Sequence, residues 1–435
     1  MAVTDIPPPP TAYVNARLMD PATGLDQPGT LYAEGETIAD LGPGLFADGV
    51  PSHAQTVDCE GLILSPGLVD MRVQLREPGE EHKGTLASAG LAAAAGGVTS
   101  MVCLPNTRPV IDDVSVVEFV ARRARLLGLA KVYPYGAVTK GLEGQELAEM
   151  GMLAESGAVA FTDGTVPVAD TATMRRALQY AATFDLLIVQ HPEEPGLAGS
   201  GVVNAGTMAT RLGLVGIPPQ AEVMMIERDL RLLELTGGRL HFAHVTTGEA
   251  IDVIRRAKVR GLQVTCDTAP FYFALNELAV GDYRTFSKLS PPLRTEDDRL
   301  AVIEGLRDGT IDVIASDHAP EDEEAKRLPF GQAAYGGIGL ETLLPITLEL
   351  VRNGHLELIE ALRLITSAPA DLLGLTGGRL TKGAPADLLL FDPEKPWKID
   401  RDDMISKSKN TPFDGYLTQG RPKRTVVDGR TVFQF

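Results

Sequence analysis

Four side chains that could bind a metal ion or move a proton each follow a short apolar run of the kind that forms a buried strand. They are Asp163, His191, His244 and Asp317. In a barrel of parallel strands, the C-terminal strand ends form one rim, where ligands bind. Imidazole and carboxylate are ligands that zinc accepts, and bound zinc lowers the pKa of water to about 7. Together the four predict a metal-dependent hydrolytic site, with Asp317 as the general base or as a further ligand.

A second polar set lies on the expected strand 68–75. Arg72, Gln74 and Arg76 alternate with apolar residues, so they share one face of that strand. Burying three polar side chains inside a barrel costs free energy unless they bind something. We therefore expect this face to line the same site.

The elements that must position these side chains alternate between strand and helix from residue 64 onward. Strands are expected at 68–75, 98–104, 131–137, 159–161, 186–190, 240–243, 263–266 and 312–315. Helices are expected at 85–95, 114–127, 146–155, 171–184, 221–236, 248–259, 296–306, 340–353 and 356–367. Eight strands, each with a helix, predict an α/β fold of the (β/α)8 barrel type.

Both ends of the chain show a different pattern, with apolar and polar residues alternating in short runs. These runs fill 11–62 and return after Gly377-Gly378, where Asp428-Gly429 predicts a hairpin. We expect a small β-sandwich built from both chain ends, with the barrel inserted between them. The expected boundaries are 1–63, 64–376 and 377–435.

Composition narrows the classes of partner. The formal net charge is -18, which argues against nucleic acid or an anionic membrane as the main partner. The sequence contains no run of about 18 apolar residues, the length needed to cross a bilayer. The three cysteines are few and far apart, which is typical of a reducing compartment. We expect a soluble, cytoplasmic protein.

The chain resembles the dihydroorotases, of the cyclic amidohydrolase branch of the amidohydrolase superfamily. The matching blocks are 66–70, 75–79, 105–109, 191–194, 244–247, 291–294, 316–320 and 339–342. The resemblance implies reversible hydrolysis of the dihydroorotate ring amide to carbamoyl aspartate by zinc-activated water, in a homo-oligomer.

The resemblance also implies roles for single residues. Arg76 and Asn106 would hold the substrate carboxylate. Asp163 would bridge two metals, with His191 and His244 on the second metal. Asp317 would be the general base.

Departures from the family pattern fall in the same site. Arg72 and Gln74 stand where the family has His-x-His, two ligands of the first zinc. A guanidinium has no lone pair and repels a dication, and an amide is a poor zinc ligand. We expect Arg72 to pair with Asp163 or Asp317 instead. Ser290 and Glu321 also replace an Asn and a His of the family, and 269–272 reads Ala-Pro-Phe-Tyr.

Two interpretations follow. In the first, the protein is a non-catalytic dihydroorotase homologue that assembles with aspartate transcarbamoylase and holds no metal. In the second, it is a working dihydroorotase or related ring-amide hydrolase, with one zinc on Asp163, His191 and His244. The acidic run 321–324 is expected to be a solvated loop, and His318 to orient the loop that it lies on.

Overall fold

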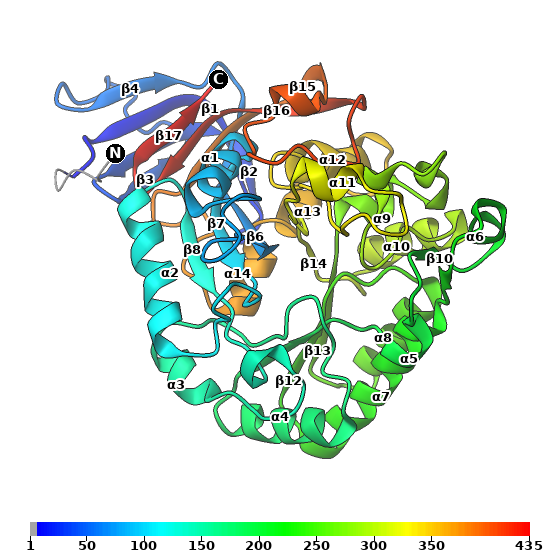
Figure 1. Ribbon diagram of the computed structural model, residues 1–435. Helices are drawn as coiled ribbons and strands as arrows, with labels where there is room; N and C mark the ends of the chain where they lie inside the picture. The colour runs from blue at the N-terminus through cyan, green and yellow to red at the C-terminus, as the bar shows by residue number, and fades with distance from the viewer. Residues whose placement is uncertain (1–6) are drawn as a thin grey trace.

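A computed structural model describes residues 7–435, and its β domain combines both ends of the chain. The strands are β1 (Thr11–Asp20), β2 (Leu25–Glu34), β3 (Thr37–Gly42), β4 (Gln55–Asp58), β5 (Ile63–Pro66), β15 (Leu388–Lys398), β16 (Leu417–Val427) and β17 (Arg430–Gln434). They form one sheet in the order β17-β16-β15-β5-β1-β2-β3, with β4 added on β1. Antiparallel pairing of β5 with β15 joins the two ends, which lie side by side in Figure 1.

The second unit is a barrel of parallel strands. They are β6 (Leu68–Val73), β7 (Val98–Cys103), β8 (Lys131–Pro134), β9 (Leu187–Gln190), β12 (Arg239–Phe242), β13 (Val264–Thr268) and β14 (Val313–Ile314). They form two ladders, β6-β7-β8 and β14-β13-β12-β9. Single bridges close the circle, at Gly136–Phe161–Ile188 on one side and at Val73–His318 on the other. The expected strand 159–161 is therefore present only as bridge contacts.

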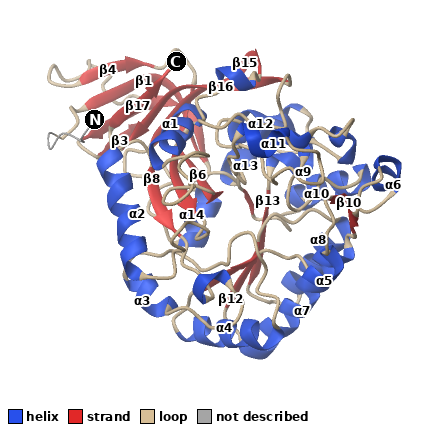
Figure 2. Ribbon diagram, viewed as in Figure 1, coloured by secondary structure: helices blue, strands red, loops and turns tan. Residues whose placement is uncertain are grey.

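Helices surround these strands on the outside (Figure 2). The principal ones are α1 (Leu86–Gly96), α2 (Val114–Leu127), α3 (Met150–Glu155), α4 (Thr171–Thr183), α7 (Gln220–Thr236), α8 (Gly248–Val259), α10 (Glu296–Arg307), α12 (Leu343–Arg352), α13 (Leu358–Arg363) and α14 (Ser367–Leu373). The arrangement confirms the predicted barrel and a β domain drawn from both chain ends.

Short elements fill the connections. They are η1 (Lys140–Leu142), α5 (Pro195–Ala198), β10 (Val203–Asn204), α6 (Thr207–Leu212), β11 (Gly216–Ile217), α9 (Pro270–Ala274), η2 (Glu277–Val280), η3 (Thr285–Ser287), α11 (Glu323–Arg327) and η4 (Arg401–Asp403). No helix among residues 7–435 is long and apolar enough to cross a membrane.

Local signals explain where α1 begins and ends. The Thr85 hydroxyl accepts from the Ser88 amide, and the Ser88 hydroxyl accepts from the Thr85 amide. This capping box satisfies two amides that would otherwise have no acceptor. At the other end Gly97 adopts φ 84°, which a residue with a side chain rarely tolerates. The expected helix 146–155 is shorter, because Thr139 and Leu147 form an antiparallel bridge and Ala148 donates to the Val138 carbonyl.

The barrel and the β domain are joined by buried polar contacts as well as by chain connections. Lys131, at the start of β8, lies 2.8 Å from a carboxylate oxygen of Asp387 and 2.7 Å from one of Asp428. Thr425 on β16 donates to the carbonyl of Ala94 on α1. These contacts brace the N-terminal side of β7 and β8. The segment between β15 and β16 reaches the opposite rim, where the Glu321 amide donates to Asn410 Oδ1 at 3.1 Å.

Candidate functional site

Sharp turns of the backbone mark the rim where β6, β12 and β14 end. Arg76, His244 and Asp317 have φ of 66°, 39° and 50°, in the left-handed region that favours glycine. A non-glycine residue held there costs about 1–3 kcal/mol, and such strain clusters at ligand sites. The rim retains the strained geometry of a functional site.

Arg72 lies inside the barrel mouth, with 2% of its side chain exposed. Its Nε donates to Asp317 Oδ1 at 2.9 Å, and its Nη2 donates to the Gly164 carbonyl at 3.1 Å. Of the two partners expected for Arg72, the structure therefore selects Asp317. Burial acts to raise the pKa of the Asp317 carboxyl, but His244 and Arg72 outweigh it and lower that pKa to about 2.

A chain of hydrogen bonds continues from this ion pair through both predicted histidine ligands. His244 Nδ1 lies 3.2 Å from Asp317 Oδ2, and His244 Nε2 lies 2.7 Å from His191 Nδ1. If His244 donates to the carboxylate, its Nε2 accepts from His191, so both of its ring nitrogens are engaged. Burial, and then the neighbouring His244 and Arg72, lower the pKa of His191 well below its usual value.

Asp163 is held apart from this chain by its own partners. Its Oδ1 accepts from the amides of Val138 and Thr139 at 3.0 and 2.9 Å, and its Oδ2 accepts from the Thr139 hydroxyl at 2.5 Å. Burial raises the pKa of this carboxyl despite those bonds. In the structure Asp163 fixes the turn after β8.

The arrangement of the candidate ligand side chains shows whether a metal ion can be held at the rim. Within residues 7–435, no group of three or more His, Cys, Asp or Glu side chains is arranged to hold a metal ion. The Arg72 guanidinium lies at the position of the missing His-x-His ligands, with Nη2 3.5 Å from His244 Nε2, and its buried Nη1 has no hydrogen-bond partner. The residues as they lie do not fit a binuclear zinc centre, since a dication and a guanidinium repel each other.

The residues predicted to bind substrate also have partners within the protein. Asn106 Nδ2 donates to Gln74 Oε1 at 3.1 Å. Arg76 Nε donates to the Pro320 carbonyl at 3.0 Å, and its two terminal nitrogens lie 3.1 Å from Glu80 and 2.5 Å from Glu321. Both predicted substrate contacts are therefore engaged, Asn106 by an amide and Arg76 by carboxylates.

Glu321 differs from the expectation of a solvated acidic run. It is 6% exposed and forms ion pairs with Arg76 and Lys83, whereas Glu323 and Glu324 are exposed and begin α11. Sequence reasoning missed Glu80 and Lys83 as its neighbours. Glu80 lies four residues after Arg76 and three before Lys83, so these two pairs are local in sequence, whereas nothing local points to Glu321.

Two other histidines serve structure. His318 Nδ1 accepts from the Gly339 amide at 3.2 Å, which confirms that it orients its loop. His241 points into the barrel, where its ring nitrogens contact Thr265 and Asp267. Burial and the nearby Arg76 lower the pKa of His318 to about 3, so it is neutral at pH 7.

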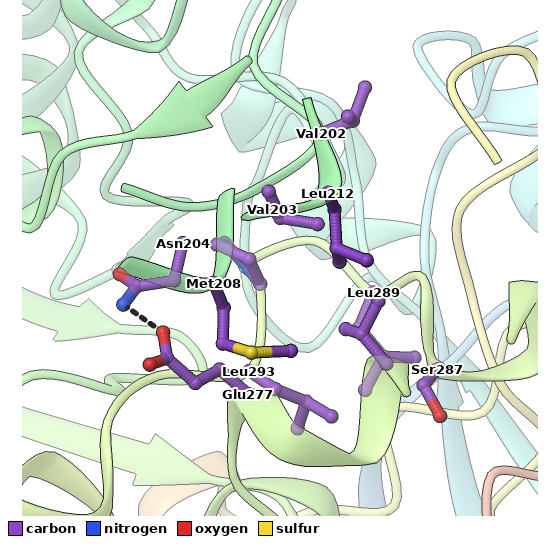
Figure 3. A pocket seen from close by; sticks show the side chains of 11 residues that line it. Val202, Val203, Asn204, Met208, Leu212, Glu277, Ser287, Leu289 and Leu293 are labelled. Atoms are coloured by element: carbon purple, nitrogen blue, oxygen red, sulfur yellow. Dashed lines mark hydrogen bonds between the residues drawn. The ribbon is translucent and has the colours of Figure 1, made fainter. Parts of the chain in front are cut away.

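A cavity of about 520 Å³ opens over these groups, lined by Arg72, Gln74, Arg76, Asn106, Asp317 and Glu321 among others. A separate, much smaller hollow lies beneath β10 and α6, and Figure 3 shows its mostly apolar lining. There Asn204 donates to Glu277 at 2.8 Å. Of these two, the larger cavity holds the charged side chains of the rim.

Known proteins share both sequence and fold with this chain. The family profile described as "Dihydro-orotase-like" matches residues 61–250, and the one described as "Amidohydrolase family" matches residues 305–433. The dihydroorotase of Anaplasma phagocytophilum is 46% identical over 97% of this chain and 95% of its own. The chain belongs to the dihydroorotase family. The dihydroorotase of Syntrophotalea carbinolica is 48% identical over 97% of this chain and 98% of its own.

Solved structures extend the likeness of this dihydroorotase-family chain to its fold. The L-hydantoinase (dihydropyrimidinase) of Arthrobacter aurescens superposes with a TM-score of 0.86 at 25% identity, over 98% of this chain and 96% of its own. The dihydropyrimidinase of Brevibacillus agri gives a TM-score of 0.85 at 23% identity, over 98% and 95%. The amidohydrolase barrel with its β-sandwich is therefore the fold of this protein.

Proposed function

We propose that this protein serves pyrimidine biosynthesis in the cytoplasm as a non-catalytic member of the dihydroorotase family. In this role it binds aspartate transcarbamoylase and stabilises the complex. The observation that carries the proposal is the Arg72–Asp317 ion pair, 2.9 Å long and nearly buried, in the barrel mouth. A buried charge pair of this kind is costly to break, because removing one partner leaves an unpaired charge.

The rest of the site supports the same role. His244 has both ring nitrogens in contact with protein groups, and Asp163 is bound to Thr139. Arg76 and Asn106 are bound to protein side chains as well. Hydrolysis needs a base that is free to accept a proton and open positions for the reacting groups. In this site the base is ion-paired, and the binding groups are bonded to other side chains.

The test is complex formation with the aspartate transcarbamoylase of the same organism. Sedimentation of the two purified proteins at micromolar concentration should give one species of fixed stoichiometry, and the transcarbamoylase should unfold at a higher temperature within it. Dihydroorotate added to the complex should not be ring-opened by this chain. Separate sedimentation of the two proteins would contradict the proposal.

A second candidate is an active dihydroorotase, or a related ring-amide hydrolase, with one zinc on Asp163, His191 and His244. It is favoured by 46–48% identity to proteins named dihydroorotase over 97% of the chain. For this function Asp163 must leave Thr139, and Arg72 must release Asp317, which would then act as the base on dihydroorotate or carbamoyl aspartate. Zinc-dependent ring opening that His191→Ala abolishes would establish this candidate and exclude the first.

A further inference from the structure

Glu321 and Arg76 meet at the wall of the 520 Å³ cavity, in a closed ring of four charges. Arg76 Nη2 lies 2.5 Å from Glu321 Oε1, and Lys83 Nζ lies 3.1 Å from Glu321 Oε2. Glu80 completes the ring, 3.1 Å from Arg76 and 3.0 Å from Lys83. Two cations and two carboxylates cancel, so the ring carries no net charge.

The ring is sheltered from water, which makes its charge balance matter. Arg76 is 9% exposed and Glu321 is 6% exposed. All three guanidinium nitrogens of Arg76 already have an acceptor, since Nε donates to the Pro320 carbonyl. A ligand carboxylate that entered here would meet a matched cation and two carboxylates, and like charges repel strongly at low local dielectric.

A second charge pair lines the same cavity. The guanidinium of Arg72 is paired with Asp317, and Glu193 adds one further carboxylate to the lining. The two arginines of the lining therefore face three carboxylates. The field of the cavity disfavours anions.

What the cavity does offer is an amide edge. Asn106 Nδ2 donates to Gln74 Oε1 at 3.1 Å, and no other described residue bonds to Gln74 Nε2 or Asn106 Oδ1. One donor and one acceptor side by side match the N–H and C=O of a cyclic amide or ureide. Such a ring can bind without a charge of its own.

We propose that Glu321 determines ligand specificity: it occupies Arg76 as an internal carboxylate, so the cavity selects an uncharged cyclic amide over one that bears a carboxylate. This goes beyond the proposed function and requires that the cavity of a dihydroorotase-family barrel still receives a ring amide. Glu321→Gln removes the internal anion but keeps the side-chain size, which frees Arg76 Nη2 to pair with a ligand carboxylate. Arg76 Nε and Nη1 keep their acceptors on Pro320 and Glu80.

The test compares dihydroorotate with dihydrouracil, the same ring without the carboxylate, by ligand-observed NMR titration in the presence of a chelator. The natural protein should bind dihydrouracil, and should bind dihydroorotate more weakly. Glu321→Gln should tighten dihydroorotate at least ~10-fold and leave dihydrouracil within ~2-fold, as expected for one charge-assisted pair. Adding Arg76→Ala to that variant should remove the gain.

Controls keep the result specific. Glu324→Gln removes the same charge from an exposed position three residues further along, in α11, and should behave as the natural protein does. Glu321→His offers a second variant without the carboxylate if the first folds poorly. The preference of the natural protein for dihydrouracil over dihydroorotate is measured without any variant. Tighter binding of dihydroorotate than of dihydrouracil by the natural protein, no binding of dihydrouracil, or no gain in a folded Glu321 variant would overturn the inference. Because chelator excludes metal-dependent turnover, failure of the proposed function would appear separately, as zinc-dependent ring opening.

Discussion

At the scale of single residues, the ion pair between Arg72 and Asp317 sets the chemistry of the site. The same carboxylate lies 2.9 Å from a guanidinium and 3.2 Å from an imidazole, so Asp317, the proposed general base, is held by contacts within the protein. Its pKa of about 2 reflects the neighbouring His244 and Arg72, which together outweigh burial. A base with so low a pKa accepts a proton poorly at pH 7.

Breaking that pair should be costly and should show coupling. Arg72→Met leaves Asp317 without its cation and should lower the free energy of unfolding by about 3 kcal/mol. Asp317→Asn in the same chain should recover part of the loss, because no unpaired charge then remains. Urea unfolding of both single variants and the double variant measures the coupling. Arg327→Met is the matched control, since its pair with Glu323 is exposed and should contribute nothing measurable. Strictly additive losses in Arg72→Met and Asp317→Asn would argue against the pair.

Metal content offers an independent test of the same position. Arg72→His with Gln74→His removes the guanidinium and supplies two imidazoles, so zinc per chain after supplementation should rise above that of the natural protein. Elemental analysis of dialysed protein measures it, with Arg72→Lys and Gln74→His as the paired control that keeps a cation. An unchanged zinc content in the bis-histidine variant would show that the contacts of Asp163 and His244 by themselves prevent binding.

At the scale of elements, α7 holds the loop that carries His244. Glu222 is 1% exposed and accepts from the amides of Thr246 and Thr247 at 2.9 and 3.0 Å, and from both of their hydroxyls. In Glu222→Gln an amide NH₂ replaces one accepting oxygen and faces the donors of Thr246 and Thr247, which should lower the free energy of unfolding by about 2 kcal/mol. Hydrogen exchange at 244–247 should accelerate, while Glu227→Gln, exposed on the same helix, should change neither. Equal effects of the two variants would remove this role from Glu222.

Asp229 on the same helix gives a pH dependence. Burial is the largest influence and raises its pKa to about 6, against the opposing effects of Arg228 and Gln190. Between pH 4 and 6 the folded state therefore binds more protons than the unfolded state, so this group's contribution to stability falls as pH rises. Asp229→Asn should gain about 2 kcal/mol relative to the natural protein between pH 4.5 and pH 7. Urea unfolding at both pH values measures this gain, and a pH-independent difference would contradict the shifted pKa.

Apolar periodicity and the glycine and proline signals at element ends predicted most helices and strands, because local sequence determines where these elements form. The helix 114–127 was predicted at the bounds of α2, and the Gly96-Gly97 signal falls at the end of α1. Contacts between distant segments were less predictable. The sequence left the partner of Arg72 open between Asp163 and Asp317, and nothing local indicated that Thr139 binds Asp163. Glu321 was misjudged for the same reason, since its partners lie more than 230 residues away.

At the scale of the whole molecule, the family scaffold persists around an altered centre. Both chain ends join in one sheet, and Lys131 ties the barrel to Asp387 and Asp428. These contacts lie away from the strand ends that carry Arg72 and Asp317. The proposed function requires that fold and surface be kept for assembly, which a scaffold independent of its site residues allows.

The most direct test of the central claim is made on the intact natural protein, expressed with added zinc and purified without chelator. Bound zinc is measured by elemental analysis, and ring opening of dihydroorotate is followed in the same sample. The account predicts zinc well below one ion per chain and ring opening no faster than in buffer. One or more zinc ions per chain, together with ring opening that a chelator abolishes, would contradict it.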